Sequence, residues 1–171
     1  MELSKENIII LEEFKSAIKK VYDCSDGYFS PTKGRERSMV FRVAHHLANQ
    51  IEEKLKLFVD IEATRCNGIA KRANVKRIIY NETIVVPDLI VHERKGKGYL
   101  VVEFKCHKDS EEKKHDCNKL KIFTTLVKDK DLSKCCPTYE LGAFVYLGDT
   151  LDKVEITLFQ NGAEYETIKG L

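Results

Sequence analysis

The sequence predicts one α/β domain in which helices flank a mixed β-sheet. Segments with helical periodicity and segments with strand periodicity follow one another in the order helix, helix, three strands, helix, two strands. The 171 residues, 43% of them hydrophobic, are enough for one domain with a substantial core but not for a second full domain. No internal repeat or low-complexity linker divides the chain. We therefore treat residues 1–171 as a single domain.

The first predicted helix covers residues 4–22. Ser4 can cap it, and a turn-rich stretch over residues 23–31 ends it. Apolar residues recur at helical spacing at Leu11, Phe14, Ile18 and Val21.

A longer helix is predicted from about residue 34 to residue 55. Its inward stripe consists of Val40, Val43, Ala44, Leu47 and Ile51. Counting about 100° per residue places Glu36 on the same stripe, where it would face the core and could serve as a ligand. Glu36 could equally be a first-turn acid that complements the helix dipole. Both interpretations stay open at this point.

Three strands are predicted next, over residues 56–65, 85–93 and 99–105. Asp60 and Glu62 in the first of them lie two residues apart and so share a face, where we interpret them as solvated acids. The second and third strands form a hairpin, because the connection over residues 94–98 holds two glycines.

The last part of the chain predicts a third helix and two closing strands. Asp109 with Glu112 three residues later forms a capping box for the helix. Its apolar residues are Leu120, Phe123, Leu126 and Val127. The strands lie near residues 142–147 and 154–159.

Charged residues gather at one end of the predicted hairpin. Pairing outward from the turn brings Asp88, which directly follows Pro87, opposite the region of Phe104 and Lys105. Glu103 and Lys105 must project to the same face because strand side chains alternate, while Phe104 points into the core. Two acids and a lysine therefore meet at one place.

Such a group of side chains has a chemistry available to it. Neighbouring carboxylates raise each other's pKa unless a cation lies between them, and Mg²⁺ prefers carboxylate oxygen while keeping waters that a phosphate can replace. Lys105 could then orient the attacking water or stabilise developing negative charge. The alternative is a structural cluster in which Lys105 only neutralises a carboxylate.

Pro87-Asp88, fourteen intervening residues and Glu103-Phe104-Lys105 resemble the signature of the PD-(D/E)xK nuclease superfamily, which has the restriction-endonuclease-like fold. Residues from about 34 to 147 match that core order of helix, three strands, helix and strand. Residues 1–30 would then be an added N-terminal helical extension.

The resemblance implies a hydrolase with a definite division of roles. Asp88 and Glu103, with Glu36 as a further ligand, would bind Mg²⁺ or Mn²⁺, and Lys105 would serve the attacking water. The expected activity is that of a metal-dependent nuclease, such as an endonuclease, with DNA as the favoured substrate and RNA as the second choice. The rival is a non-catalytic nucleic-acid-binding or assembly module that keeps the fold.

Several basic residues are candidates for binding phosphate groups of a nucleic acid. They are Lys71, Arg72, Lys76 and Arg77, with Lys33, Arg35 and Arg37 before the long helix. Lys119 resembles a position where the family often has a basic or polar helper. A solvated charged face is the alternative for all of them.

Overall composition restricts the partners and the compartment. Lys and Arg number 29 against 27 Asp and Glu, so the net charge of +2 indicates no general nucleic-acid-binding surface and any basic footprint must be local. The six cysteines favour free thiols over a disulfide framework or a zinc site. Without a leader or a membrane-spanning run, we expect a soluble cytoplasmic protein that binds no membrane. Formation of a homodimer is left open.

Overall fold

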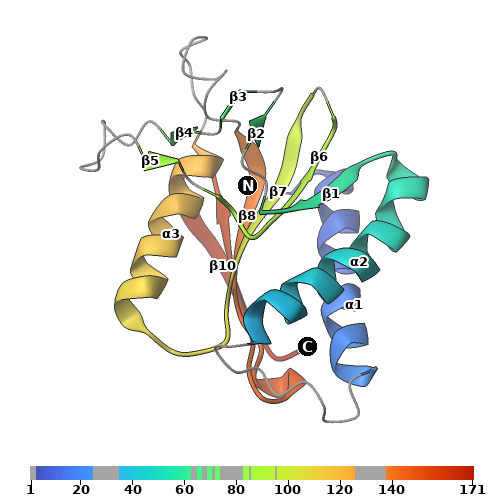
Figure 1. Cartoon of the computed structure of the whole chain (residues 1–171), viewed down its shortest axis with the longest axis vertical. Coiled ribbons are helices and arrows are strands. Elements are labelled where there is room, and N and C mark those ends of the chain that lie inside the picture. The colour runs from blue at the N-terminus through green and yellow to red at the C-terminus, as the bar shows by residue number, and fades with distance from the viewer. Residues whose placement is uncertain are drawn as a thin grey trace.

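The computed structural model is an α/β structure in which three helices pack on a mixed six-stranded sheet (Figure 1). It describes residues 3–24, 35–62, 65–66, 69–70, 72–73, 83–84, 86–94, 96–125 and 138–171. The strands of the main sheet are arranged in the order β1-β6-β7-β8-β9-β10. The predicted fold class is confirmed at this level, as an α/β domain with a mixed sheet between helices.

Helices α1 (Lys5–Asp23) and α2 (Glu36–Leu55) agree with the first two predicted helices. The Ser4 side chain accepts a hydrogen bond from the Asn7 N–H, which is the expected cap. All nine apolar residues predicted to face inward on the two helices are buried. The predicted turn over residues 23–31 lies almost wholly outside the described residues.

Helix α3 (Ser110–Thr124) begins where the sequence predicts. Asp109 accepts hydrogen bonds from the Glu111 and Glu112 N–H groups, as an N-cap should. The Oε2 atom of Glu112 lies 3.4 Å from Lys105 Nζ and 3.2 Å from His107 Nε2, so this side chain also contacts the end of β7. Predicted helix residues Leu126 and Val127 lie outside the described residues.

The sheet combines antiparallel pairs with one parallel pair. Its strands are β1 (Phe58–Ile61), β6 (Leu89–His92), β7 (Gly98–Lys105), β8 (Tyr139–Tyr146), β9 (Glu155–Gln160) and β10 (Ala163–Lys169). β1, β6 and β7 pair antiparallel, β7 and β8 pair parallel with α3 in the connection, and β8, β9 and β10 pair antiparallel. A parallel neighbour needs such a crossover.

Three predictions about strands need correction. The first strand is shorter than residues 56–65, because Lys56 has a left-handed φ of 56° that ends α2 and Glu62 has a φ of 46° just after β1. The second strand covers only Leu89–His92 of the predicted residues 85–93, because Asp88 lies in a bend. Strand β10 was not predicted, because nearly all its side chains are exposed and no apolar alternation marks it.

Four two-residue strands form two small pairs between β1 and β6. β2 (Arg65–Cys66) pairs with β3 (Ile69–Ala70), and β4 (Arg72–Ala73) pairs with β5 (Thr83–Ile84).

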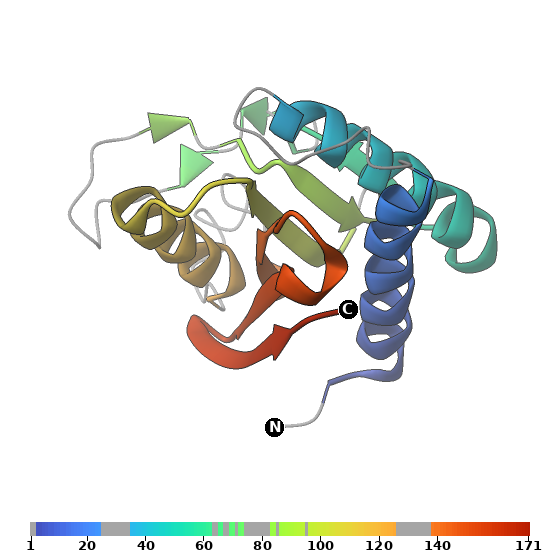
Figure 2. The ribbon, with the colours of Figure 1, turned by 90° about the horizontal axis from the view of Figure 1, so that it is seen from below.

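Two separate cores lie on the two faces of the sheet. α1 and α2 cover one face and α3 covers the other, as Figure 2 shows end-on. Leu100, Val102 and Phe104 of β7 belong to the core under α1 and α2, whereas Val101 belongs to the core under α3. By strand alternation Glu103 and Lys105 therefore face α3.

Candidate functional site

The predicted meeting of Asp88, Glu103 and Lys105 is present at the end of the β6–β7 hairpin. Asp88 lies in a bend just before β6, and its Oδ2 accepts a hydrogen bond of 2.7 Å from the Phe104 N–H. Leu89 pairs with Val102, which brings Asp88 level with the last residues of β7. Phe104 is fully buried, as predicted, so it fixes the strand between the two charged positions.

Glu36 joins the same place from α2. Its Oε2 accepts a 3.0 Å hydrogen bond from the Cys106 N–H, one residue beyond the end of β7. This contact favours the inward-facing interpretation of Glu36, because the carboxylate reaches the strand end instead of only solvent. Three carboxylates from three parts of the chain thus surround the end of β7.

Helix α3 contributes a second layer of charges on the face toward which Glu103 and Lys105 project. Lys119 Nζ lies 2.9 Å from Glu103 Oε1 and 2.7 Å from Asp116 Oδ1. The other oxygen of Asp116 lies 3.3 Å from Lys105 Nζ, and Glu112 Oε2 lies 3.4 Å from the same ammonium. Asp116 therefore bridges the two lysines.

Crowding and burial make ionisation of two of the acids costly. Burial raises the pKa of Glu103 to about 8 against the attraction of Lys119, and the negative charges of Asp88 and Asp116 add to the rise. Burial also raises the pKa of Asp88, although the hydrogen bond from Phe104 and the charge of Lys119 oppose it, and Glu36 adds repulsion. Asp88 therefore lies close enough to both Glu36 and Glu103 for their negative charges to repel one another.

The lysines and Asp116 stabilise one another's charged forms. Burial acts to lower the pKa of Lys105, but Asp116 and Glu36 bring it above its ordinary value. The pKa of Lys119 is also raised in spite of burial, chiefly by Glu103 and Asp116. For Asp116 burial acts to raise the pKa, but the hydrogen bonds and positive charges of Lys119 and Lys105 together outweigh burial and lower the pKa. Both ammonium groups therefore stay positive beside the carboxylates.

The donor set fits a hard divalent cation in its chemistry. Among the described residues, no group of three or more His, Cys, Asp or Glu side chains converges as a ready-made metal site. Mg²⁺ does not require one, since it is usually held by one or two carboxylates together with waters and phosphate oxygens. Asp88 and Glu103 supply such carboxylates, and Glu36 lies next to Asp88.

A cavity of about 440 Å³ opens beside these acids. Its lining combines charged and apolar side chains: Glu36, Arg37, Glu62, Asp88, Val40, Phe41 and Ile61. A molecule in this cavity would contact two carboxylates of the site, so the acids are accessible from the surface of α2.

The predicted phosphate-binding residues have different outcomes. Lys33, Lys71, Lys76, Arg77 and the side chain of Arg72 lie outside the described residues, so their role stays a prediction. Arg35 precedes α2, and the Arg37 side chain is 91% exposed with Nε 3.4 Å from Glu62 Oε1. The Lys119 side chain is only 17% exposed and lies inside the carboxylate cluster.

Other residues singled out in the sequence contribute no side chain to the charged cluster, although Glu62 lines the same cavity as Glu36 and Asp88. Asp60 is exposed and pairs with His92 at 2.8 Å, and Glu62 is exposed, in keeping with solvated acids. Cys24, Cys106 and Cys117 are free thiols, whereas the remaining three cysteine side chains are outside the described part of the chain. None of the described helices is long and apolar enough to span a bilayer.

Sequence reasoning missed Asp116 and the alternative role of Glu112. A signal for them exists in the third helix, because Asp116 precedes Leu120 and Phe123 by four and seven residues and so shares their buried face. An acid on a buried helical stripe needs a partner, and the nearby lysines supply it.

Comparison with known proteins adds no family to this description of the fold and site. No family model matches the chain, and the searches of curated proteins and of solved structures also return no match.

Proposed function

We propose that the chain is a metal-dependent nuclease that hydrolyses phosphodiester bonds of DNA, with RNA as the second choice. The observation that carries the proposal is the placement of Asp88, Glu103 and Lys105 together at the end of β7, where Asp88 Oδ2 is bonded to the Phe104 N–H. A lysine beside two buried or half-buried carboxylates is the combination that metal-assisted phosphodiester hydrolysis needs.

The order of the elements supports the same proposal. Helix α2, the antiparallel strands β1, β6 and β7, the crossover helix α3 and the parallel strand β8 follow the order of the restriction-endonuclease-like core that the sequence motif suggests. In this scheme α1 is an addition to the core at its N-terminal side.

Each residue has a definite task in the proposed reaction. Asp88 and Glu103 would hold Mg²⁺ or Mn²⁺, with Glu36 as a further ligand, and the ion would supply Lewis-acid activation of a phosphate and of water. Lys105, kept positive by Asp116 and Glu36, would orient the attacking water and stabilise negative charge on the phosphate oxygens. Asp116 would hold the Lys105 ammonium in place.

A second candidate is a nucleic-acid-binding or assembly module without cleavage activity. It is favoured by the ion pair between Lys119 and Glu103, which neutralises a proposed ligand without any metal. The two candidates differ in whether a divalent cation binds among the acids and whether Lys105 is needed for turnover.

The deciding experiment is a cleavage assay on single-stranded, duplex and branched DNA and on RNA. Activity should require Mg²⁺ or Mn²⁺ and should vanish in chelator. Lys105→Ala should lower turnover by about 10² or more, because it removes one positioned catalytic group, and it should leave metal binding largely intact.

Lys108→Ala is the matched control, because Lys108 lies three residues further on with a 73% exposed side chain, a 4.0 Å contact to Glu155 and its ammonium 5.0 Å from the Tyr146 ring centroid, and none of these contacts involves the cluster. It should cleave like the wild type. Cleavage that survives in chelator, or equal losses in both lysine variants, would contradict the proposed mechanism. A folded Lys105→Ala protein that no longer binds metal would favour the structural cluster.

A further inference from the structure

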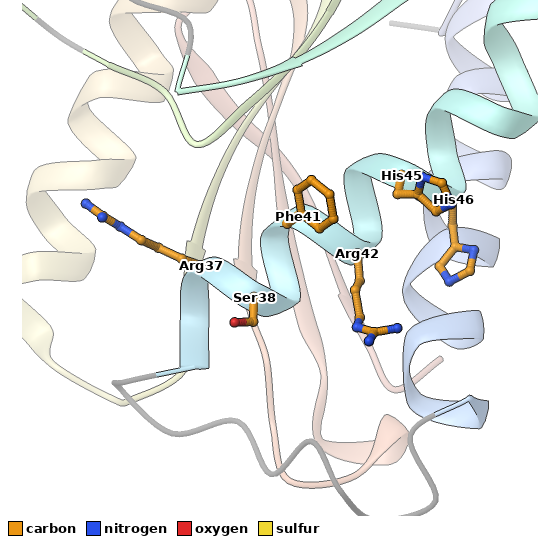
Figure 3. Close-up of a pocket in the computed structure, with 6 residues that line it drawn as sticks. All are labelled: Arg37, Ser38, Phe41, Arg42, His45 and His46. Atoms are coloured by element: carbon orange, nitrogen blue, oxygen red, sulfur yellow. The ribbon is translucent and has the colours of Figure 1, made fainter.

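The exposed side of α2 carries a hollow of about 720 Å³, which we call the α2 groove; Figure 3 shows the side chains that line it. It is lined by Arg37, Ser38, Phe41, Arg42, His45 and His46. Arg37 and Phe41 also line the cavity that contains Glu36 and Asp88. The groove and the proposed cleavage site are therefore contiguous.

Helical spacing explains why these six side chains share one side of α2. Residues 37, 41 and 45 follow one another at intervals of four, and residues 38, 42 and 46 form a parallel row. The inward stripe around Val43 and Leu47 lies on the opposite side of the helix. Each interval of four residues advances about 6 Å along the axis, so either row extends about 12 Å.

The lining combines positive charge with one exposed aromatic ring. Arg37 and Arg42 supply the positive charge, Arg37 with its Nε 3.4 Å from Glu62 Oε1, and no acid is among the described lining residues of the groove. The pKa of His46 is lowered by burial first and then by the positive charges of His45, Lys20 and Arg42, and these charges contribute a positive local potential. This potential would attract phosphate groups.

Phe41 is the most exposed of the large hydrophobic side chains in the described structure, at 59%. Ile61, another member of that small set at 39%, lies with Phe41 in the lining of the cavity beside the acids. An exposed aromatic ring between cations is the arrangement on which single-stranded nucleic acids stack their bases. A duplex offers no free base face except at its ends.

We infer that the α2 groove binds a single-stranded stretch of nucleic acid that leads into the acid cluster, with Phe41 stacking on a base and the arginines contacting phosphates. This inference rests on the proposed nuclease function and specifies its substrate as a single strand or a single-stranded end.

Binding is measured in chelator with the Lys105→Ala protein, so that cleavage cannot interfere. The probes are a labelled oligothymidylate and an oligouridylate of about a dozen nucleotides, an abasic oligonucleotide of the same length and a DNA duplex. Phe41→Ala should weaken binding of both base-containing strands by about 5- to 100-fold and should hardly change binding of the abasic strand. Phe41→Tyr should bind like the parent.

Arg37→Gln tests the phosphate contacts. It should weaken binding of base-containing and abasic strands alike and reduce the slope of log K against log salt by about 0.7, the value for one phosphate contact on a single strand. Because the Arg37 side chain is 91% exposed, its replacement should leave the fold intact. The matched controls are Tyr165→Ala and Lys169→Gln on exposed positions of β10, which should change neither affinity nor slope.

Three outcomes would overturn the inference. They are unchanged oligonucleotide affinity in Phe41→Ala, equal losses on abasic and base-containing strands, and a change of oligomeric state that shows Phe41 to be a contact between copies of the chain. Cleavage assays distinguish failure of the groove inference from failure of the proposed nuclease function. If Lys105→Ala loses cleavage but Phe41→Ala binds like the parent, the α2 groove is not the binding site and the proposed nuclease function stands. If the oligonucleotides bind as expected but no metal-dependent cleavage occurs, the binding groove stands and the nuclease function is contradicted.

Discussion

Asp88 shows how one backbone hydrogen bond fixes a charged side chain whose ionisation is otherwise costly. Its Oδ2 accepts from the Phe104 N–H at 2.7 Å, yet burial and the charge of Glu36 raise its pKa. When the pKa of an acid is higher in the folded than in the unfolded state, the free energy of unfolding falls as the pH rises from the unfolded-state pKa through the folded-state pKa. At neutral pH the metal-free protein is therefore destabilised by ionised Asp88.

Asp88→Asn should therefore leave the metal-free protein as stable as the wild type or more stable, because the Asn oxygen can still accept from Phe104. Millimolar Mn²⁺ should raise the melting temperature of the wild type by about 5 to 10 °C at a hundredfold excess over Kd, and should hardly shift the variant. Thermal unfolding with and without metal measures both effects. Identical shifts in the two proteins would place the ion elsewhere.

The sequence was sufficient to predict the residues of the cluster that are held by local geometry. Asp88, Glu103 and Lys105 come from one hairpin, whose register follows from a short turn and from strand alternation. Asp116 and the ion pairs of Lys119 depend on how α3 docks on the sheet, which residue spacing within the hairpin does not specify. The information that the sequence pattern lacks is the tertiary packing of α3 on the sheet.

Among the elements, the two long helices were predictable to within two residues at each end because their buried stripes repeat at helical spacing. Strand β10 lacks such a pattern, since it lies at the sheet edge with nearly all side chains exposed. Its signal is in the preceding turn, where Asn161 and Gly162 both have positive φ, the requirement that makes Asn-Gly a common hairpin turn.

Helix α3 provides a test of how an element supports the cluster. Asp109 caps α3, which carries Asp116 and Lys119, whereas Ser4 caps α1, which contributes no residue to the cluster. Asp109→Ala and Ser4→Ala should each lower the free energy of unfolding by about 1 kcal/mol, as measured by chemical denaturation. Only Asp109→Ala should also reduce cleavage, because a frayed first turn loosens Glu112 beside Lys105. Equal activity in the two variants would mean that the cap of α3 does not influence the cluster.

At the level of the whole molecule, α1 is part of the core, although residues 1–30 are predicted from the sequence to be an added extension. Phe14 is completely buried, and its ring centroid lies 6.1 Å from that of Phe104 in β7. The residues on either side of Phe104 are Glu103 and Lys105. The packing of α1 thus reaches the strand that carries the proposed catalytic groups.

Phe14→Ala should accordingly lower the free energy of unfolding by about 3 to 5 kcal/mol, the usual cost of removing a buried aromatic ring. Chemical denaturation should show one transition moved to lower denaturant. Ile8→Ala and Ile9→Ala on the exposed side of the same helix, where the side chains are 49% and 44% exposed, should cost little. A small loss in Phe14→Ala, or two separate transitions, would indicate an independent extension.

The hydrogen bond between Glu36 and Cys106 joins residues 70 apart in the chain, whereas that between Asp88 and Phe104 joins residues 16 apart. Closing the longer loop costs about 1 kcal/mol more chain entropy, and contacts between distant segments form more slowly. During refolding the hairpin acids should therefore meet before α2 arrives with Glu36. A partly folded chain would then hold a divalent cation with two carboxylates at most, and the third would arrive only as the tertiary structure is completed.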